Sequence, residues 1–488
     1  MYPAVIAATR GAAVRSGARA KFISWFVLGL SIGLLMVANS QLTGDQAQLL
    51  NLGWQLAHNH IWLPHGMITS AGGFSPGGFA GVLVAAPLYL WNDYRAPALF
   101  ILMCHAGAFL LLIRTLKPAL TELGRYLLLV LLWLSPWHLY FAAHVWDANF
   151  MYVFAVLHLV TAHRMARQRE IWTTAAHVLL LGLSLQIHTS GFILCVLSLL
   201  LFAAGRLKVS WTGFVMGAAV SVASLVPWFA AVRQHAAWLP GDKGFLLRGI
   251  VYVFPLLRGV LYWLKLSSLS FVERMYDLDF TPVLGATLGP PVSVVAKLLA
   301  MLAGMTLIVT VWLQWRFFRT AWRRSVARRA APYRPRSWLR FYVTATCGAA
   351  LICFALSPTT IMFWQLFVAL PASALAMVMS AEVVFRSRFK HSARRVAGVW
   401  AAVSATLLLS QAVASPMYRC GGSSPEDSDP MFIDLHAKAQ CARTVARLRE
   451  TPKPGHHLLG SELPGTLRSA SAIQPRFFIA RKGASIQR

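Results

Sequence analysis

Long apolar stretches alternate with short basic runs along this chain of 488 residues, and this alternation restricts its possible folds more than any other feature. Only 12% of the residues are charged and 57% are hydrophobic, with a mean hydropathy of +0.58. A soluble protein of this length would need far more charge to cover its surface. The pattern therefore predicts an all-α polytopic membrane protein.

Apolar stretches long enough to cross a bilayer recur about eleven times, counted at roughly 20 residues each. The first, 22–38, follows a basic N-terminal segment, and we interpret it as a retained helix because many other spans follow it. The other predicted spans are 97–113, 126–143, 150–163, 174–188, 191–205, 211–232, 291–314, 340–356, 361–384 and 396–414.

The positive charges indicate how the spans are oriented. A net charge of +29 often indicates a nucleic-acid partner, but here the bases lie in short loops between apolar stretches and no nucleic-acid-binding motif accompanies them. The pattern predicts a cytoplasmic N-terminus. The inward bases are Arg114, Lys117, Arg125, Arg164, Arg167, Arg169, Arg206 and Lys208, with two longer runs at 316–340 and 386–395.

This orientation divides the chain into a transmembrane domain, 1–414, and a polar C-terminal segment, 415–488, on the outward (periplasmic) side. Two long outward loops are predicted within the domain, at 39–96 and 233–290. An outward segment would lie in an oxidising compartment, where a Cys420–Cys441 disulfide is one possibility.

Each long loop contains a shorter apolar stretch that we do not count as a span. Residues 76–91 are bracketed by glycine and proline, and we interpret them as a half-inserted outward segment. Residues 245–264 are interrupted by Arg248, Pro255 and Arg258, and we interpret them as interfacial helix. Counting either one as a span would place a strongly basic loop on the outward side.

Asp45 is the acidic residue that most merits attention in the first outward loop. Thr43 and Gln46 match a helix capping box, and an acid in the first turn complements the helix dipole, so a purely structural role would be sufficient. However, the chain has only 16 acidic residues, and a carboxylate beside a membrane interface is a functional candidate. Both interpretations remain open on the residues alone.

Three sequence blocks resemble a known superfamily. These are GDQAQLLNLGWQLAHN with the apolar GGFSPGGFAGVLVAAPLYLW, then SPWHLYFAAHVWDANFMYVFAVLHL at 135–159, and QIHTSGF at 186–192. Together they resemble the GT-C fold of polyprenyl-phosphate-sugar glycosyltransferases, in particular the protein O-mannosyltransferase and lipid A aminoarabinose transferase group. The resemblance covers roughly the first 230 residues, and its motifs are degenerate.

The resemblance implies roles for individual residues. The acid of the first loop, Asp45 here, would deprotonate or orient the acceptor hydroxyl. The family more often has a second acid directly after it, where this chain has Gln46, and this departure argues against a metal at the pair. The acid of the second outward turn corresponds to Asp147, for which the alternative is a helix N-cap.

Four further residues complete the predicted substrate-binding set. His144 and His188 fall at outward turns, where a histidine is more often a hydrogen-bonded interfacial residue. Arg258 and Lys265 lie at helical spacing in the second loop, where either could hold the lipid phosphate, although each could equally be a snorkelling charge. No cysteine–histidine cluster with metal-ligand spacing is present, so we predict no metal site, and a divalent cation is possible but not favoured.

The predicted function is an integral membrane glycosyltransferase of the bacterial inner membrane. It would move a sugar, with inversion, from a polyprenyl-phosphate donor to a periplasmic acceptor such as lipid A, a polysaccharide, a glycolipid or a protein. One alternative is a lipid-linked sugar transporter or flippase, for which charges at the bilayer midplane would be expected. Another is an O-antigen ligase or polymerase, centred on basic residues of a later loop such as Arg258.

Overall fold

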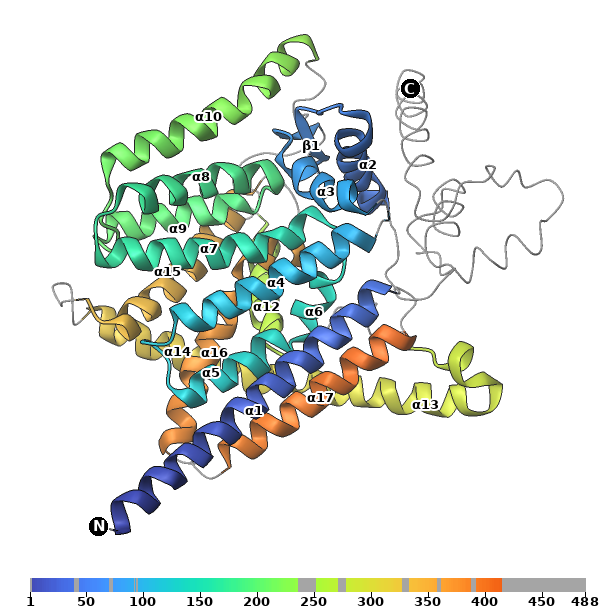
Figure 1. Ribbon diagram of the computed structural model, residues 1–488, viewed down its shortest axis with the longest axis vertical. Helices are drawn as coiled ribbons and strands as arrows, with labels where there is room; N and C mark the ends of the chain where they lie inside the picture. The colour runs from blue at the N-terminus through green and yellow to red at the C-terminus, as the bar shows by residue number, and fades with distance from the viewer. Residues whose placement is uncertain are drawn as a thin grey trace.

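The computed structural model (Figure 1) describes residues 2–38, 44–69, 73–91, 93, 95–235, 252–270, 278–326, 333–357, 361–387 and 392–414. Thr43, the residues 236–251, and the whole segment 415–488 with Cys420 and Cys441 lie outside these ranges. The described chain is helical except for one short β-hairpin, which confirms the predicted all-α membrane fold class.

The first half of the chain forms a series of helices interrupted by the hairpin. In chain order these elements are α1 (Tyr2–Ala38), α2 (Gly44–Asn59), β1 (His65–Ile68), β2 (Phe74–Pro76), α3 (Phe79–Leu90), α4 (Arg95–Thr115), α5 (Glu122–Leu128), the π-helical turn η1 (Leu129–Trp133), α6 (Pro136–Ala142), α7 (Asp147–Arg167), α8 (Ile171–Ile187), α9 (Gly191–Ala203) and α10 (Trp211–Gln234).

The second half continues with α12 (Phe254–Leu266), α13 (Thr281–Gly304), α14 (Thr306–Val326), α15 (Pro335–Leu356), the 3₁₀ turn η4 (Phe363–Ala369), α16 (Leu370–Ser387) and α17 (Ala393–Ala414). Proline lies in the first turn of α6, α12, α13 and α15. A proline is well tolerated there because its missing N–H would have no partner in the helix.

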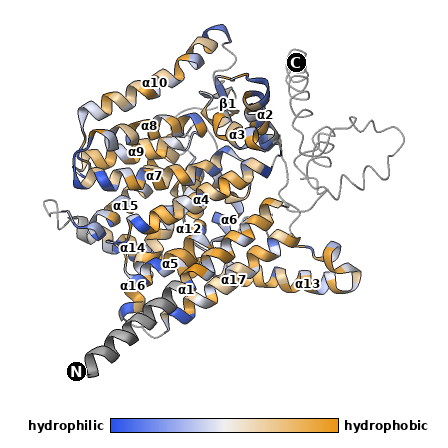
Figure 2. Ribbon diagram, in the orientation of Figure 1, coloured by the Kyte–Doolittle hydropathy of each residue, from blue (hydrophilic) through white to orange (hydrophobic). Residues whose placement is uncertain are grey.

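Seven helices of the described chain are long and apolar enough to cross a membrane, or eight if the bent pair α6–α7 counts as one span. Apolar residues cover these helices along most of their length (Figure 2). Only 17% of the apolar window of α10 is buried in the protein, against 94% for Phe363–Arg386. The first therefore presents its surface to lipid, whereas α16 forms the centre of the bundle.

The predicted count of eleven spans is not confirmed. The helices α8 and α9 have 17 and 13 residues, which at about 1.5 Å per residue is short of a hydrocarbon core roughly 30 Å thick. The predicted span 126–143 is broken by the π-helical turn and by Ser135–Pro136. The predicted span 291–314 belongs to a longer helical run, Thr281–Ala321, which begins inside the loop predicted to extend to residue 290.

The basic segments meet at one end of the bundle, which we call the basic end. The Nζ of Lys208 donates to the carbonyl oxygen of Arg167 at 2.8 Å, and the Nε of Arg169 donates to that of Val209. The guanidinium of Arg206 lies over the ring of Phe341. These contacts join three of the segments that the charge pattern assigned to a single face.

A buried carboxylate ties two further segments into the basic end. Glu382 in α16 is fully buried and pairs with Arg336 of α15 at 2.6 Å and with Arg386 at 3.3 Å. Its Oε1 also accepts from the backbone N–H of Thr121 at 3.1 Å and from the Thr121 hydroxyl. One carboxylate thus links α16 to α15 and to the start of α5.

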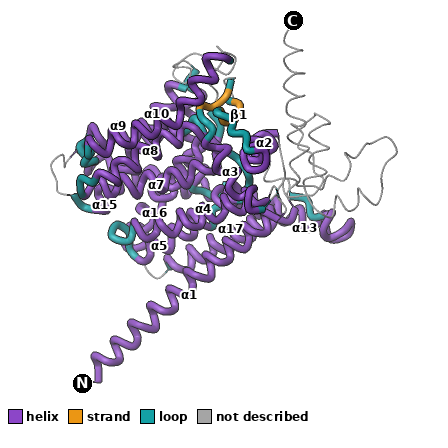
Figure 3. Tube along the Cα trace, turned by 45° about the horizontal axis from the view of Figure 1, so that its top comes forward, coloured by secondary structure: helices purple, strands orange, loops and turns teal. Residues whose placement is uncertain are grey.

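The first loop forms a small subdomain at the opposite end, which we call the loop end. It contains α2, α3 and the only strands of the described chain (Figure 3). The helices α2 and α3 pack on each other, with Gly53 so close to Val84 that a Cβ would lie 2.6 Å from it. The predicted half-inserted segment 76–91 is mostly α3, whose 12 residues are too few to cross a bilayer.

The hairpin of this subdomain docks on the end of α8. Gly77 has a positive φ of 81°, and a Cβ at this position would lie 2.3 Å from Oε1 of Gln186. Gly66 approaches the carbonyl oxygen of the same residue. The two glycines therefore permit a close approach between the first loop and the turn that follows α8.

The helix α12 is less superficial than the interfacial helix predicted for 245–264. Trp263 and Leu266 are buried in the main hydrophobic core. The indole N–H of Trp263 donates to Oε1 of Gln314, whose Nε2 donates to Oγ of Ser267 and to the carbonyl oxygen of Ser373. Buried side chains of three elements thus hold α12 inside the bundle.

Replacing Glu382 by glutamine is expected to lower the free energy of unfolding by about 3 kcal/mol, because breaking a buried ion pair leaves its partners uncompensated. Thermal unfolding of the purified protein in detergent measures this. Glu122→Gln is the matched control, since Glu122 is an exposed acid in the first turn of α5, and it should cost less than about 1 kcal/mol. Equal effects of the two substitutions would contradict the assignment.

Candidate functional site

A sharp break between α6 and α7 places Asp147 at the loop end. The two helices are bent by 117° across a break of four residues. Asp147 is the first residue of α7 and is buried, with 6% of its surface exposed. Its Oδ1 accepts a hydrogen bond from the backbone N–H of Ala148 at 2.8 Å. The predicted N-cap role is wrong, because the N-cap of α7 is Trp146 and a bond to the adjacent N–H is not the contact of a capping side chain.

Aromatic rings connect this break to Arg258. Trp146 contacts Trp364 with ring centroids 5.3 Å apart, and the neighbouring Phe363 contacts Tyr262 of α12 at 6.0 Å. Phe363 also contacts Phe141 of α6 at 5.8 Å. We call these five rings the aromatic wall. It joins three segments that are distant in the sequence: the α6–α7 break, η4 and α12.

Arg258 lies against the edge of the aromatic wall. Its Nε donates to the hydroxyl of Tyr262 at 2.9 Å, and its guanidinium lies over that ring, 5.5 Å from the centroid. No acidic side chain of the described residues pairs with it. Guanidinium groups bind phosphate through paired hydrogen bonds, so Arg258 retains donors suited to that ligand.

Lys265 lies seven residues after Arg258, two turns further along the same side of α12. It is half-buried, and its carbonyl oxygen accepts from the backbone N–H of Ser268 and from the hydroxyl of that residue. The helix thus carries one predicted phosphate ligand at its outer turn and a second one deeper in the bundle.

His144 lies inside the break rather than on its surface. Its Nδ1 donates to the carbonyl oxygen of Tyr140 at 2.8 Å, and its own carbonyl oxygen accepts from Nδ2 of Asn149 at 2.7 Å. The carbonyl oxygen of Asn149 in turn accepts from Nε2 of His105 at 2.8 Å. These bonds fix the shape of the break from both sides, so His144 contributes to the position of Asp147.

The structure also reveals polar residues that the sequence interpretation did not assign to the site. Asn149 and the pair His105–His138, whose ring nitrogens are 3.2 Å apart, lie buried directly behind the break. Trp364 and Phe363 complete the aromatic wall. The density of histidine and aromatic side chains in 135–159 is a sequence signal for His138 alone. His105 of α4 and the two rings of η4 lie outside that block and are brought to it only by the fold.

His188 lies in the turn between α8 and α9, at the same end of the bundle as Asp147. Its Nδ1 is 2.8 Å from Oγ of Ser190. Loss of hydration lowers the pKa of His188 to about 4. In the docked hairpin, burial likewise lowers the pKa of His65, although the hydrogen bond to the carbonyl oxygen of Gly66 opposes the shift. Both rings are therefore neutral at neutral pH.

Asp45 lies in the first turn of α2 and is exposed, while the adjacent Gln46 is buried. The rest of α2 is anchored by Leu49 and Leu50, which are fully buried. An exposed carboxylate on an anchored helix is accessible to a substrate arriving at the loop end. Among the described residues, no three histidine, cysteine, aspartate or glutamate side chains are grouped so that they could hold a metal ion.

Comparison with solved structures shows the fold. The chain is similar to ArnT, a lipid A aminoarabinose transferase, from Cupriavidus metallidurans in the apo state, with a TM-score of 0.50 and 10% sequence identity over 83% of this chain and 78% of that one. The chain is also similar to ArnT bound to undecaprenyl phosphate, with a TM-score of 0.48 and 13% sequence identity over 81% of this chain and 78% of that one. At such identities, the similarity concerns the fold alone.

A third similar structure is the oligosaccharyltransferase of Archaeoglobus fulgidus in complex with zinc and sulfate. Its TM-score is 0.46 and its identity 12%, over 84% of this chain but only 55% of that one. No protein-family profile and no curated protein sequence matches the chain. The membrane fold of ArnT is thus what the comparisons establish for this protein.

The docking of the hairpin on α8 is expected to weaken as the pH falls. Burial lowers the pKa values of His65 and His188 below their usual value of 6.5, to about 4 for His188, so the undocked state binds protons first and the stabilisation present above about pH 6.5 is lost as the pH falls. Hydrogen exchange of the amides of 65–76, corrected for intrinsic rates, should be faster at about pH 5 than at about pH 7.

The double substitution His65→Gln with His188→Gln is the control for this prediction, since it removes both titrating rings. It should abolish most of the pH dependence of exchange in the hairpin. Equal protection of the unmodified protein at the two pH values would show that these histidines do not couple docking to protonation.

Proposed function

We propose that the protein is an integral membrane glycosyltransferase that moves a sugar from a polyprenyl-phosphate donor to an acceptor at the loop end. One observation carries the proposal: the aromatic wall connects Trp146, the residue before the buried Asp147, with Tyr262, which accepts a hydrogen bond from Arg258. The shared fold with ArnT supports it, because that protein is a transferase that has been solved with undecaprenyl phosphate.

The location of the site supports a reaction on the outward side of a bacterial inner membrane. The bases with described contacts gather at the basic end, and an excess of lysine and arginine is typical of cytoplasmic loops. The loop end would then face the periplasm, together with the segment 415–488. The acceptor would be a periplasmic lipid, glycan or protein that carries a free hydroxyl or amino group.

Asp45 would act as the general base in this reaction. It would take the proton of the acceptor hydroxyl while the acceptor oxygen attacks the anomeric carbon of the sugar. The bond between that carbon and the phosphate oxygen breaks, and its electron pair leaves with the polyprenyl phosphate. A single displacement of this kind inverts the anomeric configuration, and a positioned base contributes about 10² to 10⁴ in rate.

Arg258 and Lys265 would stabilise the negative charge that develops on the departing phosphate. The hydrogen bond to Tyr262 already orients the Arg258 guanidinium before the substrate binds. Little free energy is therefore needed to orient it in the transition state. Asp147 and His188 would bind the hydroxyl groups of the sugar or the acceptor, and His144 would hold Asp147 in place. A divalent metal is not required in this scheme.

Asp45→Asn is expected to lower the transfer rate by about 10² or more, because the amide cannot accept the proton. Transfer from a synthetic polyprenyl-phosphate sugar in detergent or nanodiscs measures this. Asp93→Asn is the matched control, since Asp93 is an acid of the same loop that pairs with Arg95 at 2.6 Å. Normal transfer by Asp45→Asn would exclude Asp45 as the base.

Arg258→Gln is expected to lower kcat/KM for the lipid donor roughly tenfold to a hundredfold, as is usual for losing a hydrogen bond to a charged group. Arg233→Gln is the control, because Arg233 is an exposed arginine at the end of α10. A large loss from Arg258→Gln with none from Asp45→Asn would favour a ligase mechanism instead. Movement of the lipid-linked sugar across liposomes without transfer would favour a flippase.

A further inference from the structure

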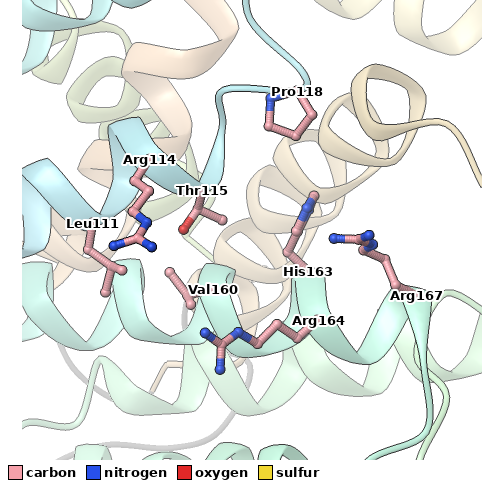
Figure 4. A pocket seen from close by; sticks show the side chains of 8 residues that line it. All are labelled: Leu111, Arg114, Thr115, Pro118, Val160, His163, Arg164 and Arg167. Carbon is pink, nitrogen blue, oxygen red and sulfur yellow. The ribbon is translucent and has the colours of Figure 1, made fainter.

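A pocket opens at the basic end, far along α7 from the Asp147 site. It has a volume of about 390 Å³ and lies between the last turn of α4, the turn that follows it and the last two turns of α7. Figure 4 shows Arg114 and Thr115 of α4 facing Val160 and Arg164 of α7, with His163 and Arg167 further along the same helix. This volume is within the range of small-ligand sites.

Three guanidinium groups line this pocket: those of Arg114, Arg164 and Arg167. All three side chains are exposed. No acidic side chain of the described part of the chain forms an ion pair with any of them. Glu382, the buried carboxylate of the same end, is already engaged by Arg336 and Arg386.

The lack of an acidic partner within the described ranges distinguishes this cluster of arginines from several neighbouring bases that are held by the protein itself. Lys208 and Arg169 donate to backbone carbonyl oxygens, and Arg206 stacks on Phe341. A single exposed arginine at a helix end can keep its charged group in water, so it would not by itself indicate a ligand. Three of these groups around a single cavity form a strongly positive concave surface, which favours an anionic ligand.

The rest of the lining suits a ligand that has both a charged and an apolar part. Leu111 and Val160 form an apolar side, whereas the hydroxyl of Thr115 offers a further hydrogen bond beside the arginines. The imidazole of His163 already lies within hydrogen-bonding distance of the Tyr333 hydroxyl, which fixes it at the pocket wall. A free inorganic anion would make no use of the apolar side.

We propose that this pocket binds the phosphate headgroup of an anionic phospholipid from the membrane leaflet at the basic end. The arginines hold the phosphodiester, Thr115 donates to it, and the first carbons of the lipid lie against Leu111 and Val160. Basic pockets between membrane helices on the cytoplasmic side commonly hold such headgroups. The pocket and the Asp147 site are at opposite ends, so this inference does not depend on the proposed transfer reaction.

The test compares how the unmodified protein and its variants bind phosphatidylglycerol. Each full-length protein is purified in detergent, titrated with the lipid and measured by native mass spectrometry. The triple variant Arg114→Gln, Arg164→Gln, Arg167→Gln should raise the Kd roughly tenfold to a hundredfold, because each base near an anionic lipid contributes several-fold. The matched control is Arg319→Gln, Arg394→Gln, Arg395→Gln, which removes the same charge from exposed positions outside the pocket.

Thr115→Phe provides a second variant that fills the pocket without changing its charge, and it should weaken binding of phosphatidylglycerol as the triple variant does. Unchanged thermal unfolding of each variant establishes that the fold is retained. Phosphatidylcholine, whose headgroup has no net charge, should bind more weakly to the unmodified protein.

Two results would overturn the proposal. Equal losses in the triple variant and its matched control would show that the lipid responds to overall charge and not to the pocket. Arginine-dependent binding of inorganic phosphate, with phosphatidylglycerol binding unaffected by the triple variant, would show that the pocket takes a soluble anion.

Discussion

The absence of water in the bilayer core is the constraint on which this structure depends. Every buried polar group must find its partner inside the protein, and helices satisfy the backbone without help from neighbouring segments. The side chains then decide how the helices assemble. Hydrogen bonds among Gln314, Ser267 and Ser373 hold α12 in the bundle. The hydroxyl of Ser404 donates to the carbonyl oxygen of Leu134 and joins α17 to the segment before α6.

The same constraint explains which parts of the fold the sequence predicts. Charge is costly in the bilayer, so bases gather where the chain leaves it, and their spacing correctly predicts a helical membrane protein whose basic segments share one end. The number of spans is harder to predict from the sequence. Hydropathy averages over a window, so it cannot distinguish α8 and α9, which are short, from full spans, and it does not detect the bend at Ser135–Pro136 or the 117° break before Asp147.

In the candidate site, too, the sequence predicts some residues and not others. Asp45, Asp147, His188 and Arg258 can be selected from the sequence because charged and polar side chains are scarce near the outward ends of the spans. The aromatic wall cannot, because Trp146, Trp364 and Tyr262 are separated by more than 100 residues along the chain and each is an ordinary aromatic residue of an apolar segment. The sequence also did not predict that α12 is buried in the bundle. Arg258 and Lys265 make this helix look interfacial, although Trp263 and Leu266 on it are buried.

The Glu382 cluster has a consequence for the biosynthesis of the chain. Thr121 and Glu382 are 261 residues apart, so the N-terminal half has long emerged from the ribosome before the carboxylate that binds it is made. Until α16 inserts, the backbone N–H of Thr121 and the guanidinium of Arg336 lack this partner, and the early helices lack this link to the later ones. Insertion of α16 supplies this link, and α17 then adds another through Ser404, so the early helices gain these ties only when the final helices have been made.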